Sequence, residues 1–283
     1  MKWAGRRESG NVEDRRGRSP GRMAVGGGLG AIVLVVVAML FGVDPRQVME
    51  LAPTTPQDQG AVPGDAHEEE LKRFVAVVLA DTEDIWGRIF TSQGSTYPAP
   101  WVVLFTGQVE SACGYATAAS GPFYCPPDQK VYMDLSFYDE LQTRFNASGD
   151  FAIAYVVAHE VGHHVQNLMG LTDKVHALQG QVSQEEYNRM SVRLELQADF
   201  LAGVWAHHAQ NTLDVVEAGD IEEAMGAAAA VGDDRIQKQT QGHVVPDGFT
   251  HGTSAQRIAW FRRGFETGDL SQGDTFGVDY EDL

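Results

Sequence analysis

Cysteine is scarce in this chain, whose 283 residues include only two, Cys113 and Cys125. A zinc site built on thiolates needs more ligands close by, and a catalytic thiol needs a base that nothing in the sequence identifies. Both cysteines lie in the part of the chain that we expect outside the cytoplasm, where an oxidising environment favours disulfides. We therefore predict a Cys113–Cys125 disulfide bond.

Basic residues are also few. The chain has 21 Lys and Arg against 39 Asp and Glu, a formal net charge of −18. Removing the seven basic and three acidic residues of the first 22 positions leaves 14 basic against 36 acidic residues, a formal charge of −22. Such a surface repels nucleic acid and anionic lipid. We therefore expect no nucleic-acid partner and assign the acidic surface to solubility.

Long stretches that are both uncharged and strongly apolar are absent except at one place. Residues 23–43, MAVGGGLGAIVLVVVAMLFGV, are 21 residues without a charge, enough helix to cross a bilayer. A cleaved signal peptide would have a shorter apolar region and a small-x-small site, which DPRQVMELAP does not offer. The basic residues ahead of the stretch predict a cytoplasmic N-terminus. We predict a single-pass inner-membrane protein with a cytoplasmic tail (1–22), a transmembrane helix (23–43), a linker (44–66) and an extracytoplasmic domain (67–283).

The pattern of the domain predicts an α+β fold, because a few strands come first and helices dominate afterwards. A strand is expected over 101–107, and a hairpin is expected around Asp128-Gln129. Ser183 and Glu186 fit a capping box at the start of a helix. Apolar residues at helical spacing predict helices over 68–90, 150–170, 183–210, 220–239 and 254–265.

The sequence AHEVGHHVQN (158–167) contains the pattern H-E-x-x-H. His159 and His163 are four residues apart on a predicted helix, so both imidazoles project from one face and can bind one zinc ion. Glu160 lies one step around the helix, where its carboxylate can take the proton of a zinc-activated water. The alternative is a buried helix whose histidines are merely hydrogen-bonded. His164 is expected to point elsewhere.

A zinc peptidase also needs a third ligand. The metzincin pattern would place glycine at 166 and histidine at 169, but the chain has Gln166 and Met169. A glutamate from a following helix is the other common solution, and RLELQADFLAG offers Glu195 with Asp199 one turn later. Asp199 then accepts a hydrogen bond from a zinc-binding histidine. The apolar neighbours of Glu195 and Asp199 argue against the alternative that both are solvent-exposed carboxylates on a helix surface. Weaker candidates for the third ligand are Asp199 itself, His207 and His208.

Several long segments are similar to a known family. They include SACGYATAASGPFYCPPDQKVYMDL, HEVGHHVQNLMG, ELQADFLAGVWA, GDDRIQ and FTHGTSAQRIAWFRRGF, and the likeness covers most of the chain. On these segments the chain resembles the bacterial neutral zinc metallopeptidases of the YpfJ type. That family in turn resembles the gluzincins, so the resemblance implies a zincin-like domain with a small sheet and several helices.

The resemblance also implies roles for individual residues. In gluzincins the glutamate of the second helix is the third zinc ligand, which favours Glu195. The spacing of Glu195 and Asp199 is also similar to that of HtpX-type membrane proteases, which carry a later H-P-x-x-x-x-R pattern. His251 and Arg257 have this spacing here, but Gly252 replaces the proline. His251 is then expected to donate a hydrogen bond to the oxyanion that forms when water attacks a peptide carbonyl. Arg257 is expected to pair with Asp199 or another acid near the metal. The alternatives are a loop histidine and a charge on a helix surface.

Together these features predict a membrane-anchored zinc endopeptidase with one Zn²⁺ per chain and Glu160 as general base. Substrates are expected to be soluble or exposed polypeptides that add a strand to a sheet edge, for which AASGPFYC (118–125) is the candidate. The alternative function is a zinc-holding envelope scaffold or binding module with little turnover.

Overall fold

Short runs of β-branched and aromatic residues form the main sheet. In the computed structural model, which describes residues 1–17, 66–143, 147 and 149–283, four strands pair in the order β1-β2-β6-β5. Their bounds are Val12–Asp14 (β1), Trp101–Phe105 (β2), Lys130–Asp134 (β6) and Phe123–Cys125 (β5). The first three run parallel, whereas β5 is antiparallel to β6 and forms one edge. This small sheet, combined with separate helices, confirms the α+β prediction.

The hairpin expected around Asp128-Gln129 is formed by β5 and β6, with Gln129 in the turn at a φ of 54°. Cys125 at the end of β5 forms a disulfide with Cys113, and their Cα atoms are 5.8 Å apart. Cys113 lies between β3 (Gln108–Ser111) and β4 (Gly114–Thr117), which form a two-stranded sheet of their own. The predicted disulfide is therefore present, and it ties this second sheet to the edge strand.

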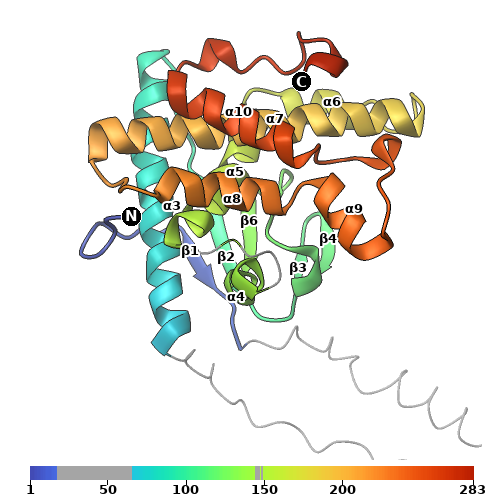
Figure 1. Ribbon diagram of the computed structural model, residues 1–283. Coiled ribbons are helices and arrows are strands. Elements are labelled where there is room, and N and C mark those ends of the chain that lie inside the picture. The colour runs from blue at the N-terminus through green and yellow to red at the C-terminus, as the bar shows by residue number, and fades with distance from the viewer. Residues whose placement is uncertain (18–65, 144–146, 148) are drawn as a thin grey trace, which may run out of the picture.

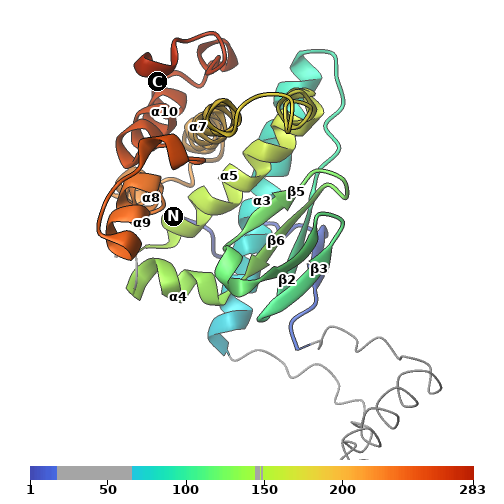
Figure 2. The ribbon, with the colours of Figure 1, turned by 90° about the vertical axis from the view of Figure 1, so that its right-hand side faces the viewer.

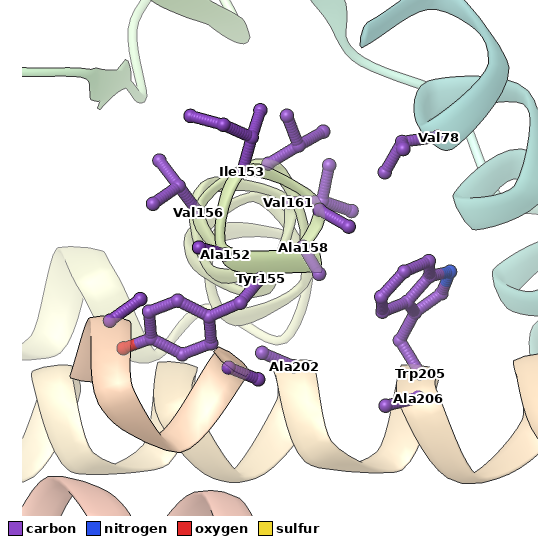
Figure 3. Close-up of a cluster of buried hydrophobic side chains, with 14 of the residues drawn as sticks. Val78, Ala152, Ile153, Tyr155, Val156, Ala158, Val161, Ala202, Trp205 and Ala206 are labelled. Carbon is purple, nitrogen blue, oxygen red and sulfur yellow. The ribbon is translucent and has the colours of Figure 1, made fainter. Parts of the chain in front are cut away.

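Helix α5 (Asp150–Leu168) lies at the centre of the fold. The sheet and α3 (Ala66–Ser92) flank it on one side, and α7 (Gln184–His208), α8 (Asp220–Ala230) and α10 (Ser254–Thr267) flank it on the other (Figure 2). Figure 3 shows α5 end-on, with Val78 of α3 and Trp205 of α7 packed around it. Because nearly every face of α5 is buried, a polar side chain on this helix must find its partners inside the protein.

Helices α7 and α10 approach each other very closely, and both views show them side by side (Figure 1). A Cβ atom added to Gly203 would lie 2.0 Å from the carbonyl oxygen of Phe261. One added to Gly264 would lie 2.0 Å from the carbonyl oxygen of Phe200. Because only glycine fits at both positions, the backbones of α7 and α10 can come into direct contact at this crossing.

The prediction of one continuous helix over 220–239 is wrong. The segment forms two helices, α8 and α9 (Asp233–Gln241), separated at Gly232, whose backbone is extended. A side chain at Gly232 would meet the backbone nitrogen of Ser254 at 2.5 Å, so the break lets the loop before α10 pack here. At the start of α7 the Ser183 hydroxyl accepts a hydrogen bond from the Glu186 backbone. The short helices α4 (Ser136–Thr143) and α6 (Leu171–His176) complete the fold.

The first 17 residues belong to the folded body. Strand β1 pairs with β2 from Val12 to Asp14, and the α-ammonium group of Met1 lies 2.7 Å from Asp150 Oδ1. The prediction of a tail (1–22) separate from the domain (67–283) therefore does not hold for residues 1–17. The predicted transmembrane helix (23–43) and linker (44–66) fall outside the described residues, except for residue 66. Among the residues that the structure does describe, no helix combines the length and the apolar character that a membrane crossing requires.

Candidate metal centre

Helix α5 presents His159 and His163 on one face, one turn apart, with ring centroids 4.8 Å from each other. Glu195 of α7 faces both rings: its carboxylate oxygens lie 3.3 Å from His159 Nε2 and 3.3 Å from His163 Nε2. Two ligands bound at about 2.0–2.1 Å to one tetrahedral zinc ion lie roughly 3.3 Å apart. The three side chains converge as a His₂Glu zinc set requires, and their ligand atoms all lie within 4.8 Å of one another.

The Nδ1 atom of His159 is fixed by Asp199, at 2.9 Å from Oδ1. The fully buried Asp199 carboxylate also accepts hydrogen bonds from the Tyr155 hydroxyl and from Arg257. The Arg257 guanidinium lies on α10 and is itself 3% exposed. Since Asp199 occupies Nδ1, His159 turns Nε2 toward Glu195, which is the orientation that metal binding needs.

The Nδ1 atom of His163 is held by Gln166, at 2.9 Å from Oε1. The Gln166 amide in turn donates to the Leu194 carbonyl at 2.7 Å and to Gln197 Oε1 at 3.0 Å, so α7 fixes its orientation. In the sequence, Gln166 excludes the metzincin pattern, but its contact with His163 was not predicted. Its spacing of three residues from His163 on one helix face was the available sign of this role.

The charges of the centre favour a cation. Burial opposes ionisation of Glu195, but His163 and His251 outweigh it and hold the pKa of Glu195 well below its usual range. Burial also opposes the charged form of His159, yet Asp199 and Glu195 raise the pKa of His159 to about 10. The carboxylates of Glu195 and Asp199 are therefore ionised at neutral pH, and a positive charge located between these two carboxylates is stabilised. A zinc ion in this position would replace the proton of His159.

Glu160 lies beside this centre and lines a cleft of about 670 Å³ together with both histidines and Glu195. The side chain is 7% exposed, and within the described ranges its carboxylate makes neither a hydrogen bond nor an ion pair. The edge strand β5 contributes Phe123 and Tyr124 to the cleft wall. A carboxylate without a partner at the wall of a cleft is available to a water molecule or a substrate.

His251 also lines the cleft, but in a loop before α10 rather than on a helix. The Asp233 carboxylate organises this loop by accepting the backbone N–H groups of Thr250, His251 and Gly252 at 2.7, 2.6 and 3.1 Å. Gly252 has a φ of 88°. Proline has neither this φ nor an N–H group. The glycine that replaces proline in the H-x-x-x-x-x-R spacing is therefore required by this loop.

The other histidines have different partners. His164, which is fully buried, contacts the Tyr124 hydroxyl at 2.9 Å and the Pro98 carbonyl at 2.6 Å, so it ties β5 to α5. His207 and His208 contact the carbonyl oxygens of Phe265 and Gly268. None of the three joins the His159–His163–Glu195 set. A second cluster of acids, formed by Asp150, Asp220 and Glu223, receives the Met1 α-ammonium group.

Comparisons with known proteins agree on the family. Residues 1–276 match the model of the family described as "Putative neutral zinc metallopeptidase". The chain is 51% identical to the uncharacterized protein YpfJ of Escherichia coli (strain K12) over 98% of this chain and 99% of that protein. It is 43% identical to an uncharacterized protein of Mycobacterium tuberculosis (strain ATCC 25618 / H37Rv), with 85% of each chain covered. No solved structure matches the chain.

Proposed function

The chain belongs to the neutral zinc metallopeptidase family, and from this premise we propose that it is a zinc-dependent endopeptidase. One observation carries the proposal. Two histidines with restrained Nδ1 atoms have their Nε2 atoms 3.3 Å from the carboxylate oxygens of Glu195, in a cleft. Beside them lies the Glu160 carboxylate, which has no partner among the residues that the structure describes. Histidines merely buried in a helix would not need a third converging ligand on another helix.

The donor set fits zinc. Two imidazole nitrogens and one carboxylate leave a fourth tetrahedral position, as catalytic zinc sites do. His159, His163 and Glu195 would hold one Zn²⁺ per chain. When bound, zinc supplies Lewis-acid polarisation of a peptide carbonyl and lowers the pKa of a bound water. Two histidines on one helix, α5, with a glutamate from a later helix, α7, form the arrangement expected of a gluzincin-like peptidase.

Glu160 is the proposed general base. It follows the ligand His159 directly on α5, and its carboxylate lines the cleft. From this position it accepts a proton from the attacking water and later delivers that proton to the leaving amine. A site that served only to hold zinc would have no use for a free carboxylate at its open side.

Arg257 and His251 have supporting roles in the proposal. Arg257 neutralises Asp199 and so holds His159 through it, acting as a positioning residue. His251 lies at the cleft with Nδ1 facing Asp233 at 3.2 Å, which leaves Nε2 for substrate. Partial desolvation in the cleft opposes protonation of the half-exposed His251 side chain, but Glu195 and Asp233 raise the pKa of His251. A protonated His251 can donate to the oxyanion that develops on a peptide carbonyl.

The substrate is proposed to be a polypeptide in extended conformation. Within the candidate segment 118–125, residues 118–120 form a short 3-10 turn, and only Phe123–Cys125 is strand. This strand is the edge of the main sheet and borders the cleft beside α5. Backbone groups of an edge strand pair readily with an added peptide strand. Such pairing recognises the substrate mainly through its backbone rather than its side chains, as expected of an endopeptidase.

The disulfide supports a place outside the reducing cytoplasm. Attachment to a membrane through residues 23–43 is part of the proposal and falls outside the described residues.

Digestion of a peptide library in water enriched in ¹⁸O tests the function. Hydrolysis by the zinc-loaded full-length protein is expected to place ¹⁸O in each new carboxyl group. A chelator is expected to stop cleavage, and added Zn²⁺ to restore it. Absence of labelled products with one zinc bound per chain would reject the peptidase and favour the zinc-holding scaffold.

A further inference from the structure

Residues 1–17 are built into the body at several separate points. The β1–β2 pairing joins this segment to the main sheet. Trp3 packs edge-on against Phe74 of α3, with ring centroids 5.5 Å apart. Backbone hydrogen bonds run along its whole length: Lys2 N to Val215 O (2.8 Å), Ser9 N to Ala76 O (2.9 Å), Val102 N to Asn11 O (2.8 Å) and Arg15 N to Leu104 O (2.7 Å).

The basic side chains of this segment are engaged in ion pairs. Arg6 contacts Asp81, a residue of α3 that is 2% exposed, at 2.7 Å. Arg16 is 6% exposed and pairs with Asp14 at 2.7 Å. Lys2, Arg7 and Arg15 also pair with acids, namely Asp214, Glu83, Asp84 and Glu13. These are five of the seven basic residues that predicted a cytoplasmic tail. All five are paired with acids, four of them with acids outside the segment, and Arg15 with Glu13 inside it.

The two sides of the gap in the described chain lie next to each other. Arg16, near the end of the first described range, contacts Glu69 at 2.5 Å and Glu68 at 3.3 Å, both in the first turn of α3. In Figures 1 and 2 the first segment and α3 meet at the same end of the molecule. Residues 17 and 66 therefore leave and re-enter the body at one place.

We infer that residues 1–17 lie on the same side of any membrane as residues 66–283. The hydrocarbon core of a bilayer is about 30 Å thick, and a hydrogen-bonded strand pair cannot extend across it. A single crossing by residues 23–43 would put β1 and β2 in different compartments. The predicted arrangement, with a cytoplasmic tail and an extracytoplasmic domain, is incompatible with the β1–β2 pairing. Because disulfides persist in oxidising compartments, the Cys113–Cys125 bond indicates that this shared side is the oxidising one.

The positive-inside rule predicted otherwise because it counts basic residues as free charges. Here several of the neutralising acids come from α3 and from the loop before α8, far along the chain. Arg15 pairs instead with Glu13 of the same segment. A folded segment with its charges paired carries little of the signal that a free basic tail would carry. The basic residues at the N-terminus are thus assigned to folding rather than to orientation.

Labelling of single cysteines in the membrane-bound full-length protein tests this inference. Gly10→Cys is suitable because a side chain at Gly10 meets nothing within 4 Å. Ala218→Cys, at an exposed position in the loop before α8, reports the domain. A membrane-impermeant maleimide added to sealed vesicles is expected to label both variants or neither, and to label both after detergent. Labelling of one variant alone in sealed vesicles would overturn the inference.

A double-mutant cycle on Arg6 and Asp81 tests the packing independently. If the two side chains touch, Arg6→Ala and Asp81→Ala remove the same ion pair. The fall in unfolding midpoint for the double variant is then expected to be clearly smaller than the sum of the two single falls. Arg6→Ala combined with Glu185→Ala, a distant exposed position on α7, is the control and should be additive. Additive losses for Arg6 and Asp81 would show that the segment does not pack against α3.

Discussion

Arg257 donates to both carboxylate oxygens of Asp199, from Nε to Oδ2 at 2.8 Å and from Nη2 to Oδ1 at 3.0 Å. Both side chains are almost wholly buried. Asp199 also accepts a hydrogen bond from the Tyr155 hydroxyl and contacts His159 Nδ1. A buried bidentate pair of this kind holds its partners in one geometry. It therefore joins α10 to the metal-binding face of α5 through one residue of α7.

Removing the charge of Asp199 should harm both folding and metal binding. Asp199→Asn leaves Arg257 buried without its counter-charge, and breaking a buried ion pair costs about 3–5 kcal/mol of unfolding free energy. Zinc affinity should fall about 10–100-fold because Nδ1 of His159 loses its carboxylate. Chemical denaturation and zinc titration measure the two effects. Asp173→Asn, at an exposed position in α6, is the matched control, and equal behaviour of the two variants would contradict the role of Asp199.

His163 supplies one of the three proposed ligands, so His163→Ala should lose stoichiometric zinc. His243→Ala removes an exposed histidine that does not line the cleft, and this variant should retain one zinc per chain. Metal analysis after dialysis, combined with circular dichroism to verify folding, gives the comparison. Full zinc occupancy in folded His163→Ala would exclude the His159–His163–Glu195 set.

The close approach of α7 and α10 predicts that glycine cannot be replaced at their crossing. A methyl group at Gly264 would meet the Phe200 carbonyl oxygen at 2.0 Å, so α10 must move away. Overpacking costs typically about 1–3 kcal/mol, and the shift should also weaken zinc binding because Arg257 moves with the helix. Gly226→Ala on α8 has nothing within 4 Å and should be neutral or stabilising by up to about 1 kcal/mol. Thermal unfolding of Gly264→Ala and Gly226→Ala measures the difference in stability. Similar unfolding midpoints for the two variants would contradict the close packing of α7 and α10.

Helical periodicity made much of the site predictable. The spacing of four residues fixes His159 and His163 on one face, and the same spacing links Glu195 to Asp199. These relationships are local, so a sequence displays them. Gln166 was missed because its partners, Leu194 and Gln197, lie on another helix. The contacts between α5 and α7 exist only in the folded chain.

The role of the N-terminal segment could not be predicted for a related reason. Arg6 and Arg16 look like free charges until Asp81 and Glu69 are placed beside them. The β1 strand has only three residues, Val12–Asp14, and a single apolar one, so it shows no alternating pattern. Its pairing with β2 depends on a contact over a long sequence separation.

The packing of β1 predicts acid sensitivity. Hydrogen bonding to Arg15, assisted by Lys130 against the opposing effect of burial, lowers the pKa of Glu13 from 4.5 to about 2. A carboxylate with a lowered folded pKa stabilises the fold above its unfolded pKa and loses this effect as the pH falls. The contribution of Glu13 should therefore be complete above about pH 4.5 and disappear toward pH 2. Glu13→Gln should lower the unfolding midpoint at pH 7 and much less at pH 2.5; an equal loss at both would contradict this account.

The most direct test of the central claim is the activity of Glu160→Gln with its zinc bound. The substitution keeps the size of the side chain but removes the proton acceptor, so the variant should fold and bind one zinc ion like the wild type. Cleavage of the best library peptide should fall by about 10²–10⁴-fold, while Glu222→Gln, an exposed glutamate on α8, should cleave normally. Undiminished cleavage by zinc-loaded Glu160→Gln would show that this site does not carry out the hydrolysis.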